Sequence, residues 1–240
     1  MLRVSATRVA RLLLWAVAAV TAAHLATAAV HYGLGYDRQL GLRPLFNLNG
    51  EANVPTWFSP ALLLLAAGLL ALIWRTTPPA ARGDRRTWAV LAAVFLFLAA
   101  DETAEIHEML NPLRDLFRAD GLLYWAWVVP YGIAGLVLLV ACLRFLRRLP
   151  RRTTALITGA GALYVGGALV LEILGGYAME RFGRGSLPVV ATYTVEELCE
   201  MLGLVLFVYA LLDYLGARGG RIDVAIEPGG RRDAAGTGVP

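Results

Sequence analysis

Charged residues are scarce in this chain. Only 17% of its 240 residues are charged, whereas a soluble domain has about 25%, and the mean hydropathy is +0.60. Lysine is absent altogether, so all 22 basic residues are arginine. This composition excludes an ordinary soluble domain, and the long apolar runs indicate a protein that crosses a membrane several times.

Several familiar motifs are also missing. The sequence has no phosphate-binding loop, no CxxC or HExxH motif and no recognisable serine–histidine–acid arrangement. Its two cysteines, Cys142 and Cys199, lie inside apolar runs, so we expect neither a disulfide nor a two-cysteine metal site. The net charge of +4 arises from arginines in short loops, which favours an effect on membrane orientation over binding to nucleic acid.

Six apolar segments follow one another, and none has the two-residue period of a membrane β-strand. We therefore predict an all-α fold, a polytopic membrane protein with a bundle of six transmembrane helices in residues 1–215. The glycine- and arginine-rich tail, 216–240, is predicted to be disordered. Membrane lipids are the expected surroundings of the predicted spans, which cover residues 12–32, 55–74, 87–110, 122–146, 153–179 and 188–215.

The arginines predict the orientation of these spans. Sixteen of the 22 lie in the N-terminal segment, in the regions 75–86 and 144–152, and in the tail. Because positive residues stay inside, both termini are expected on the cytoplasmic side of a bacterial inner (plasma) membrane. The first apolar stretch could instead be a signal peptide, since 26–28 resembles a cleavage site. Its length of about 19 residues exceeds the usual 7–15, which favours an uncleaved span.

Acidic residues interrupt the apolar spans, most densely at 101–108. Charged groups at membrane depth are costly and generally mark a functional site. With the topology above, eight carboxylates gather in the outer half of the bundle without any arginine in the same half-spans. So many anions cannot all stay ionised at close range, so we expect bound protons or cations. The eight are Asp101, Glu102, Glu105, Glu108, Glu172, Glu196, Glu197 and Glu200.

A divalent metal site is the sharper prediction. At about 100° per residue, a helix would place Asp101, Glu105 and Glu108 on one face, with His107 pointing away. Two Glu-x-x-Glu pairs on separate helices resemble, in geometry only, the carboxylate sites of ferritin-like di-iron bundles, which use Glu-x-x-His. The sequence does not distinguish among iron, zinc and manganese as the bound metal. Glu102 and Glu197 would not bind the metal and are predicted to be the catalytic groups. The predicted metal ligands are Asp101, Glu105, Glu108, Glu172, Glu196, Glu200 and His24.

Three classes of function fit such a site. The first is a metal-dependent membrane hydrolase or oxidase, open to the extracytoplasmic side and acting on a lipid or another hydrophobic substrate from the outer leaflet. The second is a proton or divalent-cation transporter or channel, although the inner halves of the spans offer almost no polar atoms. The third is a non-catalytic subunit or sensor whose acids form a structural or pH-responsive latch. Because the polar residues stop at mid-depth, the sequence favours the enzyme.

Overall fold

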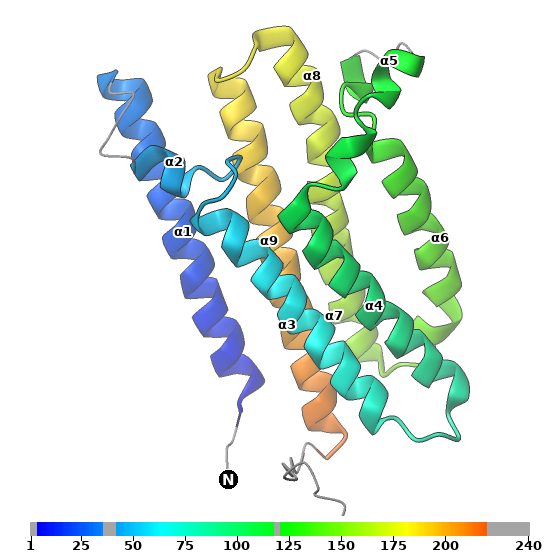
Figure 1. Ribbon diagram of the computed structural model, residues 1–240. Helices are drawn as coiled ribbons and strands as arrows, with labels where there is room; N and C mark the ends of the chain where they lie inside the picture. Colours follow the sequence, from blue (N-terminus) through cyan, green and yellow to red (C-terminus); the bar gives the residue numbers. More distant parts are fainter. Residues whose placement is uncertain (1–3, 36–41, 118–120, 220–240) are drawn as a thin grey trace, which may run out of the picture.

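The computed structural model describes residues 4–35, 42–117 and 121–219, and all regular structure in these ranges is helical (Figure 1). The short elements are α2 (Leu42–Phe46), η1 (His107–Leu110), α5 (Leu113–Phe117) and η2 (Gly121–Leu123). A π-helical segment, η3 (Gly166–Leu171), joins α7 to α8 within one span. The longer helices are α1 (Ala6–Leu34), α3 (Val54–Thr76), α4 (Arg82–Ala104), α6 (Val128–Leu146), α7 (Arg151–Val165), α8 (Glu172–Phe182) and α9 (Leu187–Ala217).

Among the described residues, six helical segments are long and apolar enough to cross a membrane, which agrees with the predicted number of spans. The first span begins and the last one ends at the same end of the bundle, as an even number of crossings requires (Figure 1). Most of the predicted disordered tail, from residue 220 onward, lies outside the described residues, whereas α9 continues to Ala217.

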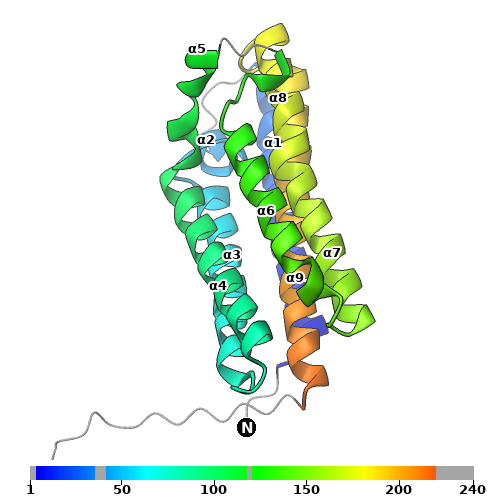
Figure 2. The same ribbon diagram turned by 90° about the vertical axis from the view of Figure 1, so that its right-hand side faces the viewer.

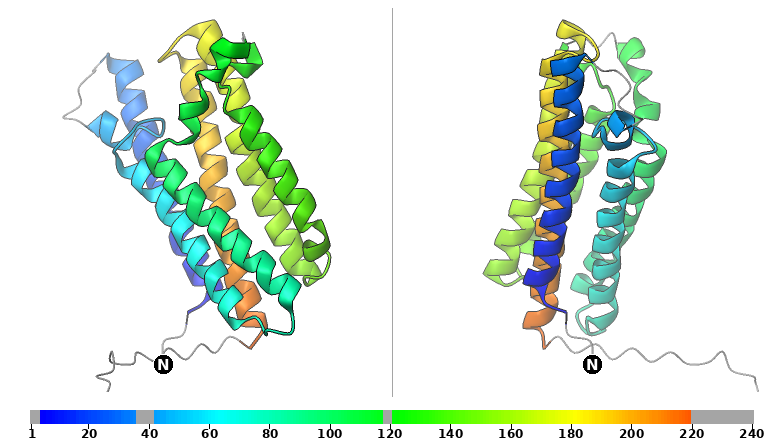
Figure 3. Two further views of the ribbon diagram at one scale, coloured as in Figure 1. Left: turned by 45° about the vertical axis from the view of Figure 1, so that its right-hand side comes forward. Right: turned by 90° about the vertical axis from the view of Figure 1, so that its left-hand side faces the viewer.

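Helix α9 lies at the centre of the bundle. It contacts α1, α3 and the whole α7–η3–α8 span. Helices α3 and α4 form an antiparallel pair on one side, while α6, α7 and α8 lie on the other (Figure 2). Helix α1 runs alongside α9 (Figure 3, right). Consequently any side chain in the middle of α9 can meet residues from several other spans.

Two glycines allow close contact between the fifth span and α9. A Cβ added at Gly167 would lie 2.9 Å from the backbone oxygen of Glu196. On α9 itself, a Cβ at Gly203 would lie 2.8 Å from the backbone nitrogen of Tyr164. Helices packed in lipid gain stability from such close backbone approach, so these two glycines hold the fifth span against α9.

The half of the bundle that contains the chain ends is filled with apolar side chains. A buried cluster there joins α3, α4, α6, α7 and α9. A second apolar cluster lies next to it and includes Leu62, Ala99 and Met201. Six acidic residues lie beyond this second cluster, toward the opposite end: Asp101 and Glu102 of α4, Glu172 of α8, and Glu196, Glu197 and Glu200 of α9. The first cluster consists of Ala66, Leu70, Ile73, Trp88, Phe145, Leu149, Ala160, Phe207, Val208, Leu211 and Tyr214.

Helix α6 begins at Val128, so Pro130 lies in its first turn, where a missing N–H removes no helical bond. One predicted helix end was wrong. The third span does not run to residue 110, because α4 ends at Ala104. The next residue, Glu105, adopts a left-handed conformation with φ of 50°. A residue with a Cβ atom is strained by roughly 1 kcal/mol in the left-handed conformation. The turn at Glu105 also changes the direction of the chain.

Candidate functional site

Asp101 anchors the polar region. Its side chain is buried, with a relative exposure of 5%. The Oδ1 atom accepts hydrogen bonds from the backbone N–H of His107 and from the hydroxyl of Tyr131, both at 2.8 Å. The Oδ2 atom lies 3.2 Å from Nδ1 of the same histidine. Both carboxylate oxygens are therefore engaged, and Asp101 is placed to orient its neighbours.

The left-handed turn at Glu105 explains why His107 meets Asp101. Had α4 continued to residue 110, the imidazole would have pointed away, as the helical phase predicted. Instead the chain changes direction after α4 and continues as η1, and the Trp127 ring packs against the imidazole with centroids 4.6 Å apart. Since Nδ1 faces the carboxylate, Nε2 is the nitrogen left for another partner. The predicted common face of Asp101, Glu105 and Glu108 is consequently wrong, because the last two are no longer on the helix.

Trp127 is a buried part of the same site. Its side chain is only 8% exposed, and its Nε1–H donates to Oε1 of Glu172 at 3.3 Å. The indole thus links the histidine to an acid of the fifth span. One sequence feature indicates this arrangement: Trp127 and Tyr131 are four residues apart at the start of α6, which places them on the same side of the helix.

A pair of carboxyl groups joins the fifth and sixth spans. The side chain of Glu172, at the start of α8, hydrogen bonds to that of Glu196 on α9. Two carboxyl groups form such a bond only when one of them holds a proton. Two ionised carboxylates this close repel each other, so a proton or a bound cation would stabilise the pair.

Three more acids lie close by, without a side-chain hydrogen bond among the described residues. They are Glu102 of α4 and Glu197 and Glu200 of α9. Each acts electrostatically on at least one of the others, and Glu172 acts on both Glu197 and Glu200. The charge of His107 also reaches Glu102 and Glu172. These acids of α4, α8 and α9 thus form one connected group near His107. We call this group the acid cluster, and its members are Glu102, Glu172, Glu196, Glu197 and Glu200.

Glycine in η3 makes room for part of this cluster. A Cβ at Gly167 would lie 2.9 Å from Cγ of Glu200, as well as from the backbone of Glu196. The π-helical turn that contains this glycine is a rare geometry that often occurs at functional sites. Any larger residue there would displace the Glu200 side chain.

Glu51, Glu105 and Glu108 lie outside the spanning helices, at the outer edge of the acid cluster. The side chains of Glu51 and Glu105 hydrogen bond to each other, and this bond is the main reason that the pKa of Glu51 rises to about 7. Partial burial and the charges of Glu105, Glu108 and Glu102 raise the pKa of Glu51 further. Glu51 therefore changes its charge near neutral pH. The structure adds it to the acids at this end of the bundle.

His24, which was predicted as a metal ligand, lies between α1 and α9. The side chain is 2% exposed, and its Nδ1 accepts from the backbone N–H of Leu48 at 3.4 Å. Its Nε2 is therefore the protonated nitrogen and faces the Thr194 hydroxyl at 3.0 Å. Both nitrogens are used within the protein, so His24 holds α1 against α9 and leaves no lone pair for a metal.

The acid cluster is not a preassembled metal centre. In the described parts of the chain, no three histidine, cysteine, aspartate or glutamate side chains are arranged around a single point as metal ligands would be. The structure brings Glu102, Glu172, Glu196, Glu197 and Glu200 near one another, with Glu51, Glu105 and Glu108 at the edge. His107 lies beside these acids, with its Nδ1 facing Asp101. His24 instead contacts Leu48 and Thr194 through its two ring nitrogens.

A family model described as "Domain of unknown function (DUF8692)" matches residues 10–215. The chain belongs to this family. The matched range contains every residue of the acid cluster. No curated protein and no solved structure matches the chain.

Proposed function

We propose that the acid cluster binds a divalent metal ion and that the protein is a metal-dependent membrane enzyme acting on a lipid or another hydrophobic substrate. The observation that carries the proposal is the meeting of acids from three spans around His107, whose Nδ1 is held by Asp101. A carboxylate that fixes one imidazole nitrogen leaves the other directed at a metal, which is the usual outer-shell arrangement of metal-bound histidines.

The roles follow from the contacts. Glu172, Glu196 and Glu200 are the proposed carboxylate ligands, and His107 Nε2 is a further ligand. Asp101 is assigned to positioning His107, because its oxygens are already engaged. A metal in this group would relieve the repulsion among the acids. Glu105 and Glu108, at the outer edge of the acid cluster, remain proposed as further metal ligands.

The chemistry that such an ion supplies is the activation of water or oxygen. Glu102 and Glu197, which form no side-chain hydrogen bond in the described residues, are the proposed general bases. A substrate has to reach the level of Glu200, midway along α9, so a molecule that dissolves in the bilayer suits the site. From the arginine distribution we also propose that this end of the bundle faces the extracytoplasmic side.

A proton-responsive latch without a metal is the second candidate. It is favoured by the two carboxyl pairs, Glu51 with Glu105 and Glu172 with Glu196, because a proton taken up between two carboxylates relieves their repulsion. Transport across the membrane receives less support, since the buried cluster in the other half of the bundle consists of apolar and aromatic side chains.

Metal analysis by mass spectrometry of the purified full-length chain tests the proposal. Wild-type protein loaded with Fe²⁺, Zn²⁺ or Mn²⁺ and then desalted should retain an ion that the Glu172→Gln and Glu200→Gln variants lose. Asp115→Asn removes an exposed acid outside the acid cluster and serves as the matched control. Equal retention in all four proteins would rule out the proposed ligands, and no retention in wild type would favour the latch.

Catalysis requires a separate readout. Metal-loaded wild-type protein in liposomes made from a bacterial lipid extract should change at least one lipid detectably by mass spectrometry. Glu197→Gln should keep the metal but lose this turnover, because the amide cannot accept a proton. A variant that retains both metal and turnover would remove Glu197 from the catalytic role.

A further inference from the structure

The turn between α6 and α7 concentrates positive charge at the end of the bundle where the chain ends lie. Residues 144–152 contain five arginines. Two of them are neutralised, Arg148 by Asp84 and Arg152 by Asp213. Within the described residues, Arg147 and Arg151 have no acidic partner. Arg144 has none in these residues either, so three exposed guanidinium groups are left beside a membrane span, and two of them, Arg147 and Arg151, line the same hollow.

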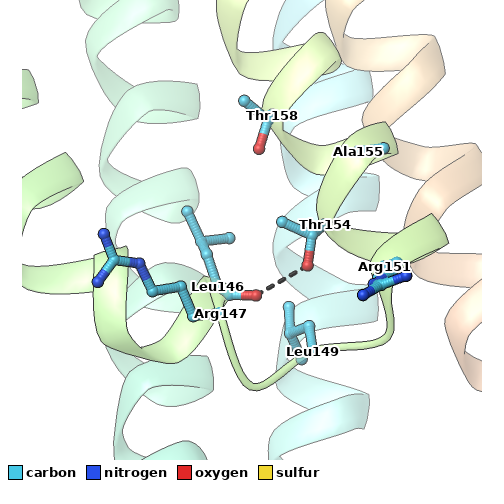
Figure 4. A pocket seen from close by; sticks show the side chains of 7 residues that line it. All are labelled: Leu146, Arg147, Leu149, Arg151, Thr154, Ala155 and Thr158. Atoms are coloured by element: carbon cyan, nitrogen blue, oxygen red, sulfur yellow. Dashed lines mark hydrogen bonds between the residues drawn. The ribbon is translucent and has the colours of Figure 1, made fainter.

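A hollow of about 410 Å³ lies beside this turn, with Arg147 and Arg151 on its opposite sides (Figure 4). Its lining also includes the hydroxyl-bearing Thr154 and Thr158 and the apolar Leu146 and Ala155. The hollow therefore has both cationic and apolar walls. A phospholipid needs both, because its phosphate is anionic and the chains attached to it are apolar.

The start of α7 adds hydrogen-bond donors. Pro150 precedes the helix and provides no side-chain cap, and the first helical bond runs from the N–H of Thr154 to the Pro150 oxygen at 2.9 Å. The earlier backbone N–H groups of the turn therefore have no helical acceptor. The Thr154 hydroxyl donates to the Leu146 oxygen at 2.8 Å, which fixes the two walls relative to each other (Figure 4).

We propose that this hollow binds the phosphate of an anionic phospholipid from the leaflet on the side of the chain ends. Arginine pairs with phosphate oxygens through two parallel hydrogen bonds, and a helix N-terminus attracts the same anion. Basic pockets at the cytoplasmic ends of transmembrane helices bind anionic headgroups for these reasons. The inference is independent of the function proposed for the acid cluster, which lies in the other half of the bundle.

Binding is measured on the full-length chain in a neutral detergent, by titrating phosphatidylglycerol or phosphatidylcholine and following lipid adducts by native mass spectrometry. Wild type should bind phosphatidylglycerol more tightly. Each arginine beside an anionic headgroup contributes roughly fivefold to affinity, so replacing Arg147 and Arg151 together by glutamine should weaken binding roughly thirtyfold. Replacing Arg181 and Arg184 by glutamine removes the same charge at the opposite end and should leave the affinity unchanged.

A second variant separates the hollow from bulk charge. Ala155→Trp keeps both arginines but fills the hollow, and it should also abolish the preference for phosphatidylglycerol. Unchanged affinity in either the arginine double variant or Ala155→Trp would overturn the proposal. A free phosphate ion, and not a lipid, would be the ligand if inorganic phosphate competed with the lipid at millimolar concentration, and this result would also overturn it.

Discussion

Asp101 and His107 are joined twice, although the α-helix that carries the aspartate ends between them. The carboxylate accepts the backbone N–H of His107 at 2.8 Å and lies 3.2 Å from its Nδ1. A left-handed residue, Glu105, ends the helix and changes the direction of the chain, which allows both contacts. The histidine is thereby fixed in position and in tautomer before any ligand arrives.

The first prediction concerns this pair. Replacing Asp101 by asparagine should weaken metal binding by roughly 10- to 100-fold, as the loss of an outer-shell partner commonly does. In a His107→Ala background the same replacement should have little further effect, because Asp101 acts through the histidine. Metal titration of the four proteins measures this coupling. Independent, additive losses would show that Asp101 contacts the metal itself.

The second prediction concerns the strained turn. Glu105→Gly and Glu105→Ala both remove the carboxyl group, but only glycine adopts a positive φ without steric cost. The glycine variant should therefore be more stable than the alanine variant by about 1 kcal/mol. Thermal unfolding of both in the same detergent decides the matter. Equal midpoints would mean that the turn relaxes in solution.

The third prediction concerns the close contact of η3 with α9. An alanine at Gly167 would place Cβ 2.9 Å from the Glu196 backbone oxygen, and the resulting overpacking should cost roughly 1–3 kcal/mol. Gly161 lies on the same span with nothing within 4 Å of an added Cβ. Gly161→Ala should be neutral or slightly stabilising, because alanine favours the helix. Unfolding midpoints that rank the two variants in the opposite order would contradict this packing.

The fourth prediction concerns pH. The pKa of Glu51 rises from 4.5 to about 7 in the folded chain, chiefly through its hydrogen bond to Glu105. The folded state then holds this proton more tightly than the unfolded state, so the contribution of Glu51 to stability is full below pH 4.5. It declines as the pH rises and is lost above about pH 7.

Melting curves between pH 4 and 8 test this dependence. Wild type should lose stability across the window, whereas Glu51→Gln should show a shallower decline, since an amide does not titrate. Glu180→Gln, which replaces an exposed acid outside the acid cluster, should retain the wild-type slope. If wild type and Glu51→Gln had parallel curves, the bond between Glu51 and Glu105 would not persist in solution.

The sequence by itself determined the number of spans and the concentration of acids at one end. Hydrophobic runs long enough for a bilayer are a local property, and so are helix starts such as the one at Asn53, whose side chain accepts from the N–H of Thr56 at 3.1 Å. Proline in the first turn, as at Pro55 and Pro188, was equally readable. The alternation of spans then placed the acids of α4, α8 and α9 at similar depth.

Only the tertiary structure decided the roles of individual side chains. The end of α4 depends on one strained residue, which no periodic pattern reveals, and it moved His107 from outside the group to its centre. Conversely, His24 left the group because partners distant in sequence, Leu48 and Thr194, use both of its nitrogens. Composition and periodicity decide only which segment carries a side chain. Where that side chain points is decided by turns of the backbone and by contacts with residues more than twenty positions away in the sequence.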